Sequence, residues 1–171
     1  MLILLGSLAC AAILAPLLIH WLGRPAFALL AAVPAAGFFW LLQHFVNDTF
    51  SGDGTLQYSL AWVPEIHLNI NLRIDALSAL FGLIITGVGA LVMLYCWGYF
   101  TSTTRRLAMF AGQMMAFAAV MMGLVSSDNF LLLYIFWEAT SVLSFLLVSY
   151  YGERASSRRA AGQALMVTVL G

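Results

Sequence analysis

Five apolar runs, each about 20 residues long, constrain this chain more than any other feature. A helix of about 20 residues crosses the roughly 30 Å hydrocarbon layer of a bilayer, and a spanning segment must satisfy its backbone hydrogen bonds internally. We therefore predict that each run is a transmembrane helix. The runs cover residues 2–21, 26–45, 76–99, 107–125 and 130–151.

The composition agrees with this fold class and excludes others. The chain is 63% hydrophobic and 8% charged, whereas a soluble domain has about 45–50% apolar and about 25% charged residues. The net charge is zero, so no basic surface points to nucleic acid. Cys10 and Cys96 lie in different runs and form no disulfide or metal framework. The sequence therefore predicts an all-α, polytopic bundle of transmembrane helices.

Both ends of the chain bear on the number of spans. No positive charge precedes the first run, so we expect a permanent span and not a cleaved signal peptide. A sixth run begins near residue 160 and reaches only residue 171, which is too short to cross. We expect five complete spans plus the start of a sixth. Residues 1–171 are then a single membrane domain fragment from the N-terminal part of a longer subunit.

A polar stretch separates the second and third runs. Residues 68–75 alternate strictly between apolar and polar side chains, which is the period of a β-strand. Residues 55–60 form an earlier run that could pair with them. We predict a short β-hairpin-like loop at the membrane surface.

The arginines predict the orientation. Six of the seven lie in the loops after the first, third and fifth runs, and the only other one is Arg73. Loops rich in arginine remain in the cytoplasm. The N-terminus and the hairpin should therefore be extracytoplasmic.

Glu138 is the one ionisable residue well inside a span, near the middle of the fifth run. An acidic residue at that depth costs about 2.5–3.5 kcal/mol and normally faces a protein interior or a water-filled cavity. All basic residues are arginines in loops or at helix ends. Burial disfavours a charged carboxylate and a nearby cation favours it. A glutamate whose cationic partner approaches and leaves can therefore act as a proton switch, and we expect that partner in the C-terminal remainder of the subunit.

Polar side chains accompany Glu138 on its helix. Tyr134 and Ser141 fall on its face at helical spacing, and Thr140 and Ser144 lie to either side. The alternative to a proton pathway is interhelical hydrogen bonding, which is the usual role of Ser and Thr in membranes. We favour the functional interpretation for Glu138 because such bonding does not need an acid.

The remaining polar residues are weaker candidates. Asp75, at the start of the third run, either caps that helix or takes part in transport. The third run also holds Gly82, Gly87 and Gly89, which we expect to permit close helix packing. We find no sequence feature that binds a metal, flavin, iron–sulfur cluster or nucleotide.

Two stretches resemble the antiporter-like membrane subunits. Residues 127–147, which include Trp137-Glu138-Ala139-Thr140-Ser141, resemble the fifth-helix motif of this family, and residues 71–89 resemble its third-helix entry. The family includes the A and D subunits of Mrp-type Na⁺/H⁺ antiporters. It also includes proton-pumping subunits of respiratory complex I and of membrane-bound hydrogenases. The Trp-Glu-Ala-Thr-Ser pattern is most similar to the Mrp A subunit.

The resemblance implies a function and its partners. The fifth-helix glutamate of this family is the key proton-pathway acid, which corresponds to Glu138, and it pairs with a lysine on a later helix. We expect monovalent cation/proton antiport, with Na⁺ as the cation, by a secondary transporter subunit that is not an enzyme. Its partners would be other subunits of a hetero-oligomeric complex in the bacterial inner membrane. The alternative is a redox-driven proton pump of the complex I or hydrogenase kind, and a third class is a structural membrane anchor.

Overall fold

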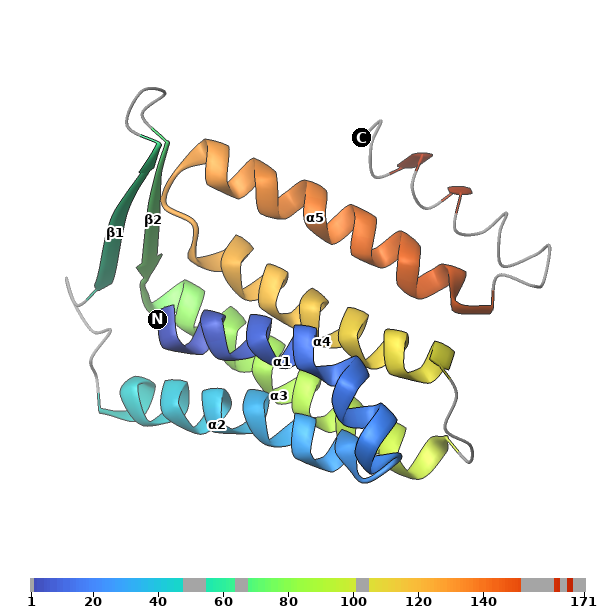
Figure 1. The fold of residues 1–171 in the computed structure, drawn as a ribbon. Helices are drawn as coiled ribbons and strands as arrows, with labels where there is room; N and C mark the ends of the chain where they lie inside the picture. The colour runs from blue at the N-terminus through green and yellow to red at the C-terminus, as the bar shows by residue number, and fades with distance from the viewer. Residues whose placement is uncertain are drawn as a thin grey trace.

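The computed structural model describes residues 2–47, 55–63, 68–100, 105–151, 162–163 and 166–167. Five long helices lie side by side, and a two-stranded hairpin stands at one end of the bundle (Figure 1). All five helices are long and apolar enough to cross a membrane. The helices are α1 (Leu2–Leu22), α2 (Ala26–Val46), α3 (Ala76–Tyr99), α4 (Arg105–Ser126) and α5 (Phe130–Val148), and the strands are β1 (Leu56–Val63) and β2 (Leu68–Ile74).

The five predicted spans are confirmed, with small shifts at their ends. Helix α4 begins at Arg105, two residues before the apolar run. Helix α5 ends at Val148, and Ser149–Tyr151 form a short 3₁₀ turn after it. The predicted sixth segment falls mostly outside the described residues, although residues 162–163 and 166–167 are helical.

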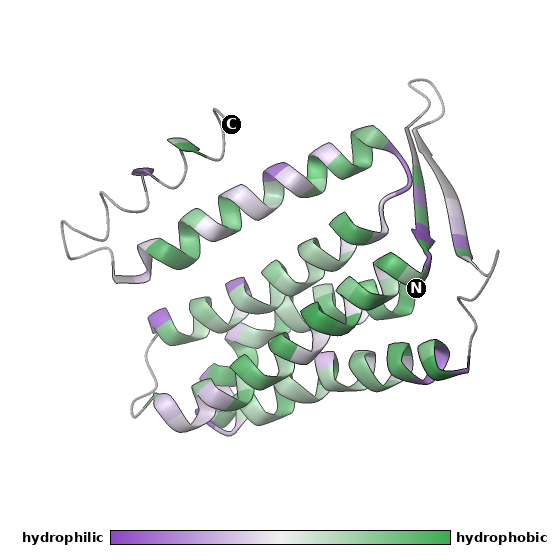
Figure 2. Ribbon diagram, turned by 180° about the vertical axis from the view of Figure 1, so that it is seen from behind, coloured by the Kyte–Doolittle hydropathy of each residue, from purple (hydrophilic) through white to green (hydrophobic). Residues whose placement is uncertain are grey.

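The helices pair out of chain order. Helix α1 packs most extensively on α4, and α2 on α3. Large side chains such as Leu8, Phe27 and Met122 are completely buried between these four helices. Helix α5 packs on α4 at the edge of the bundle (Figure 1). Figure 2 shows hydrophobic residues along the whole length of the helices, as expected for elements in contact with lipid.

Glycines bring several helices close together. A Cβ added at Gly82 would lie 2.9 Å from Leu41 Cδ1, and one at Gly87 would lie 3.1 Å from Phe38 Cδ2. Glycine at these two positions therefore permits the α2–α3 contact, as predicted. A Cβ at Gly89 would make only ordinary contacts, so packing there does not depend on glycine.

The contact between α1 and α4 involves a proline inside α1. Pro16 has no N–H to donate to the Ala12 carbonyl, four residues earlier in α1. A Cβ added at Gly112 of α4 would lie 3.1 Å from that carbonyl oxygen and 3.2 Å from Pro16 Cγ. Gly112 thus lets α4 approach α1 at the point where the α1 backbone lacks a hydrogen bond.

The predicted hairpin is confirmed. Strands β1 and β2 pair antiparallel from Leu56 opposite Ile74 onward. The free edge of β2 also joins the α4–α5 connection, because Leu72 bridges Ser127 and the Asp128 N–H donates to the Asn71 carbonyl at 2.9 Å. The hairpin therefore links the start of α5 to the start of α3.

Aromatic rings connect the helices at the opposite end of the bundle. Phe100, which follows α3, lies 6.2 Å from the Phe27 ring of α2 and 5.7 Å from the Phe110 ring of α4, measured between centroids. Arg24, in the α1–α2 turn, donates to the Trp97 carbonyl at 3.0 Å. These contacts bring the ends of α1, α2, α3 and α4 together at the arginine-bearing end.

Candidate functional site

Glu138 lies near the middle of α5 and is partly exposed. Two residues earlier, Phe136 faces α4, where its ring lies against Gly123. Two residues correspond to about 200° around an α-helix. The Glu138 carboxylate therefore projects from the side of α5 that faces away from α4.

That side of α5 is unevenly covered, since Ser141, three residues after Glu138, is only 6% exposed. Only 11% of the central residues of α5 are buried, against 44% for α4. Tyr134, one turn before Glu138, is 59% exposed. Among the residues described, none donates a hydrogen bond or supplies a cation to the Glu138 carboxylate. An acidic residue inside a span normally faces a protein interior or a water-filled cavity.

The polar residues predicted to support Glu138 take different positions. Tyr134 and Ser141 lie on its face of the helix, whereas Thr140 and Ser144 lie on other sides, at two and six residues from it. The Thr140 hydroxyl donates to the Trp137 carbonyl at 2.6 Å, and the Ser141 hydroxyl donates to the same oxygen at 3.4 Å. Both hydroxyls thus bond to the backbone of the turn that carries Glu138, a pattern that locally bends helices.

Local contacts fix the start of α5. Asn129 is the N-cap, and its side-chain oxygen accepts a hydrogen bond from the Leu131 N–H at 2.9 Å. The preceding residue, Asp128, is bonded to β2 through its backbone N–H. Neither contact was predicted from the sequence, although an asparagine just before an apolar run is a recognisable cap signal.

Asp75 lies at the start of α3, beside the hairpin and far along the chain from Glu138. Its carboxylate accepts a hydrogen bond from the Ser78 N–H at 2.9 Å and lies 3.4 Å from Arg73 Nη2. The bond from the Ser78 backbone lowers the pKa of the Asp75 carboxyl against the opposing effect of partial burial, and Arg73 lowers it further. This geometry is that of a helix N-cap, and it does not bring Asp75 to Glu138.

We predict that Asp75→Ala destabilises the protein by about 1 kcal/mol, the usual cost of losing a capping side chain. Asp75→Asn keeps the acceptor oxygen and should cost much less. Because the folded pKa is lowered, the carboxylate stabilises the fold at neutral pH, and this contribution is lost as the pH falls below about 4. Thermal unfolding of the full-length protein, followed over a series of pH values, measures both effects. Cation transport lost in both variants, at unchanged stability, would instead indicate a transport role.

Two family models match this chain. The N-terminus of chain 5 of NADH-ubiquinone oxidoreductase (complex I) matches residues 61–111. The transmembrane domain of NADH:quinone oxidoreductase and the Mrp antiporter matches residues 127–171. The first range contains Asp75 and the second contains Glu138.

Curated relatives and solved structures agree with these matches. The chain is 41% identical over 139 residues to the A1 subunit of the Na⁺/H⁺ antiporter of Staphylococcus haemolyticus, and 38% identical over 139 residues to the A subunit of the Na⁺/H⁺ antiporter of Alkalihalophilus pseudofirmus. Each alignment covers 81% of this chain and 17% of the relative. A chain in the Mrp complex structure from Dietzia sp. DQ12-45-1b matches 98% of this chain, with a TM-score of 0.83 and 29% identity, over 18% of its own length. The chain belongs to the antiporter-like membrane subunits.

A solved structure of lower sequence identity has the same fold. A chain of the archaeal membrane-bound sulfane sulfur reductase covers 95% of this antiporter-like chain, with a TM-score of 0.76 and 21% identity, over 32% of its own length. That similarity concerns the fold alone. The antiporter-like chain spans about 17% of the length of the curated relatives it matches.

Proposed function

We propose that this chain forms part of the A subunit of an Mrp-type antiporter, which exchanges a monovalent cation, Na⁺, for protons. The curated relatives described above are named as A subunits of Na⁺/H⁺ antiporters. In this proposal the subunit is a secondary transporter and not an enzyme, and it works with other membrane subunits in the bacterial plasma membrane. The structural observation that supports the proposal is the Glu138 carboxylate, at mid-helix on the side of α5 that faces away from α4.

The chemistry follows from that position. A carboxylate in an apolar span is stable when protonated or when a cation lies beside it. If a positive group from another helix approaches, Glu138 releases its proton, and when that group leaves, Glu138 binds one. Alternation between these states moves a proton between two sides of the site. Tyr134, on the same face, can hydrogen-bond water or the carboxylate along such a path, whereas the Ser141 hydroxyl donates to the Trp137 carbonyl.

The second candidate is a proton-pumping subunit of a redox complex, since one matching family model bears the name of complex I. The two functions differ in the driving force. Vesicles holding the full-length subunit with its partner subunits are given a pH gradient, and Na⁺ is then added without NADH, hydrogen or quinone. Antiport predicts that Na⁺ dissipates the gradient and that an impermeant organic cation does not. A gradient that responds only to an electron donor would favour the pump.

We also propose an orientation with the N-terminus and hairpin outside the cell, because the arginines gather at the other end of the spans. Single cysteines replace Gln57, exposed on β1, and Ser156, in the arginine-rich segment outside the described residues. The background lacks Cys10 and Cys96. A membrane-impermeant thiol reagent added to intact cells should label position 57 only. Labelling at position 156 alone would mean that the N-terminus and the hairpin face the cytoplasm.

A further inference from the structure

The polar side chains buried in the described part of the chain are three hydroxyls, and one of them is poorly bonded. Thr86, Ser126 and Ser141 are 0%, 1% and 6% exposed. The Thr86 and Ser126 hydroxyls donate to backbone carbonyls four residues earlier, at 2.6 and 2.7 Å. The Ser141 hydroxyl also donates to a carbonyl four residues earlier, but at 3.4 Å. An O–H···O bond normally measures about 2.5–3.0 Å, so the Ser141 bond is weak.

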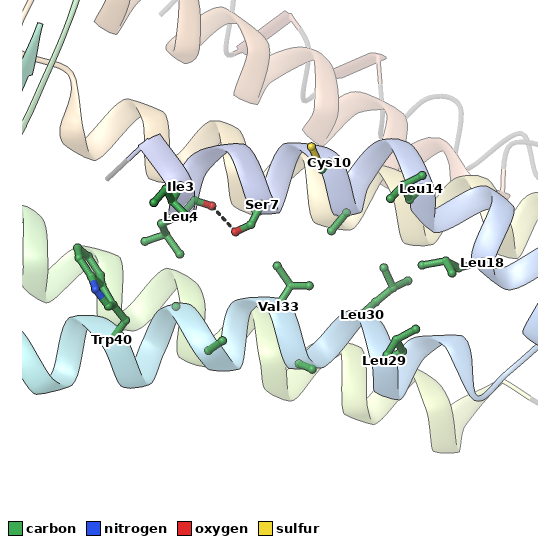
Figure 3. Close-up of a pocket in the computed structure, with 14 residues that line it drawn as sticks. Ile3, Leu4, Ser7, Cys10, Leu14, Leu18, Leu29, Leu30, Val33 and Trp40 are labelled. Atoms are coloured by element: carbon green, nitrogen blue, oxygen red, sulfur yellow. Dashed lines mark hydrogen bonds between the residues drawn. The ribbon is translucent and has the colours of Figure 1, made fainter.

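Figure 3 shows the ordinary arrangement at Ser7, beside the cavity of about 780 Å³ between α1 and α2. The Ser7 hydroxyl donates to the Leu4 carbonyl at 2.8 Å. The residues that line this cavity are almost all apolar, so they offer the hydroxyl no stronger acceptor than its own helix. Ser141 differs from Ser7 both in the length of its bond and in having a carboxyl group one turn away.

The long Ser141 bond has a local cause. The Thr140 hydroxyl donates to the same Trp137 carbonyl at 2.6 Å. That carbonyl is also the regular helical acceptor for the backbone N–H four residues later. The Thr140 hydroxyl therefore holds the better position on this oxygen, and the Ser141 hydroxyl is left at its margin. A buried hydroxyl with a weak bond is a donor that a stronger acceptor can take.

The Glu138 carboxyl group is such an acceptor when it is ionised. It lies three residues before Ser141 on the same face of α5, and side chains at this spacing are neighbours, with Cβ atoms about 5–6 Å apart. A hydrogen bond from a hydroxyl to a carboxylate is roughly twice as strong as one to a neutral oxygen. A protonated carboxyl group lacks this advantage. The preferred acceptor of the Ser141 hydroxyl therefore depends on whether Glu138 carries its proton.

The described elements packed on α5 bring no other charge to this position. These elements are α4, strand β2 and the 3₁₀ turn. Helix α4 has no titratable side chain after its first two residues. On β2, Arg73 lies 3.4 Å from Asp75, and the turn carries Tyr150, twelve residues beyond Glu138. Tyr134, on α5 itself, is 59% exposed.

We propose that Ser141 is a positioning residue for Glu138. Its hydroxyl turns from the Trp137 carbonyl to the Glu138 carboxylate when that group releases its proton, and it returns when the proton binds again. This inference rests on the proposed function of Glu138 as a proton switch. The exchange stabilises the ionised state without a second charge, while Thr140 keeps the carbonyl occupied in both states.

The test is infrared difference spectroscopy of the full-length subunit in its complex, in vesicles titrated with pH. The C=O stretch of a protonated carboxyl group is distinct from the bands of a carboxylate, and the Glu138 signal is the one that Glu138→Gln lacks. In Ser141→Ala the ionised state loses a donor. We expect the protonated Glu138 signal to persist to a pH about one unit higher, which is a tenfold change in the protonation equilibrium. The pH dependence of Na⁺-dependent flux should move in the same direction.

Two further variants separate the hydroxyl from general effects on the helix. Ser141→Thr keeps a hydroxyl at this position and should titrate like the unaltered protein. Ser149→Ala makes the same change as Ser141→Ala at a serine whose hydroxyl donates to the Leu146 carbonyl at 2.9 Å. Ser149 lies eleven residues from Glu138, so its loss should leave the titration unchanged.

Four outcomes would overturn the proposal. The titration could be the same in Ser141→Ala as in the unaltered protein, or shifted equally in Ser141→Thr or in Ser149→Ala. The unaltered protein could also show no protonated Glu138 signal at any pH. The spectroscopy needs no Na⁺ transport. A shifted titration in Ser141→Ala without Na⁺-dependent flux in the unaltered complex would therefore support this inference and contradict antiport.

Discussion

Glu138→Gln should abolish Na⁺-dependent proton flux while the complex still assembles. Glutamine keeps the size and hydrogen-bonding capacity of glutamate, but its amide does not release a proton at physiological pH. Removal of a positioned proton-transfer group typically costs about two orders of magnitude or more in rate. The measurement is Na⁺-dependent dissipation of a pH gradient in vesicles that hold the whole complex at matched expression.

The matched control is Asp128→Asn, which makes the same acid-to-amide change at the exposed residue two positions before α5. It should transport normally, because the side chain of Asp128 lies outside the span. Glu138→Asp keeps the acid but shortens its reach by about 1.5 Å, so partial activity with a shifted pH optimum is expected. Normal flux in Glu138→Gln would exclude Glu138 as the proton switch.

Gly123→Leu should have the second-largest effect, by forcing α5 away from α4. A Cβ at position 123 would come within 3.0 Å of three ring atoms of Phe136, and leucine adds three more carbons. Overpacking of this kind costs about 1–3 kcal/mol. Since Phe136 and Glu138 lie on one turn of α5, the displacement also moves the carboxylate. We expect a smaller yield of assembled complex, a lower thermal stability and weak transport.

Two further variants separate overpacking from a general effect of losing glycine. A Cβ at Gly98 of α3 would meet nothing within 4 Å, so Gly98→Leu should be tolerated. Combining Gly123→Leu with Phe136→Ala removes the ring and should restore assembly in part. If the double variant assembled no better than Gly123→Leu, the clash with Phe136 would not be the cause.

The spans and the hairpin could be predicted from the sequence because both depend on local patterns. Apolar length identified every helix, and period-two alternation identified β2 within one residue of its observed end at Ile74. The pairing of α1 with α4 could not be predicted. In a chain whose helices are apolar on all sides, hydropathy does not mark which face meets protein and which meets lipid. Small residues such as Gly112 determine which face of a helix meets another helix, and the residues they contact are distant in sequence.

The candidate site was predictable only where it depends on a local sequence pattern. An acid in an apolar span is visible in any sequence, so Glu138 could be singled out without a structure. Its orientation could not, because the side of α5 that meets α4 depends on the contact of Phe136 with Gly123. The hydroxyls of Thr140 and Ser141 were expected to support the carboxylate, but their hydrogen bonds go to the Trp137 backbone.

The link between β2 and the α4–α5 connection imposes an order on biosynthesis. Leu72 bridges Ser127, which follows it by 55 residues. At translation rates of about 5–20 residues per second, roughly 3 to 11 seconds separate the synthesis of the two partners. During that interval α3 and α4 are both made, while the Asn71 carbonyl still lacks the Asp128 N–H. Closure of this bridge therefore cannot precede the synthesis of the first four helices.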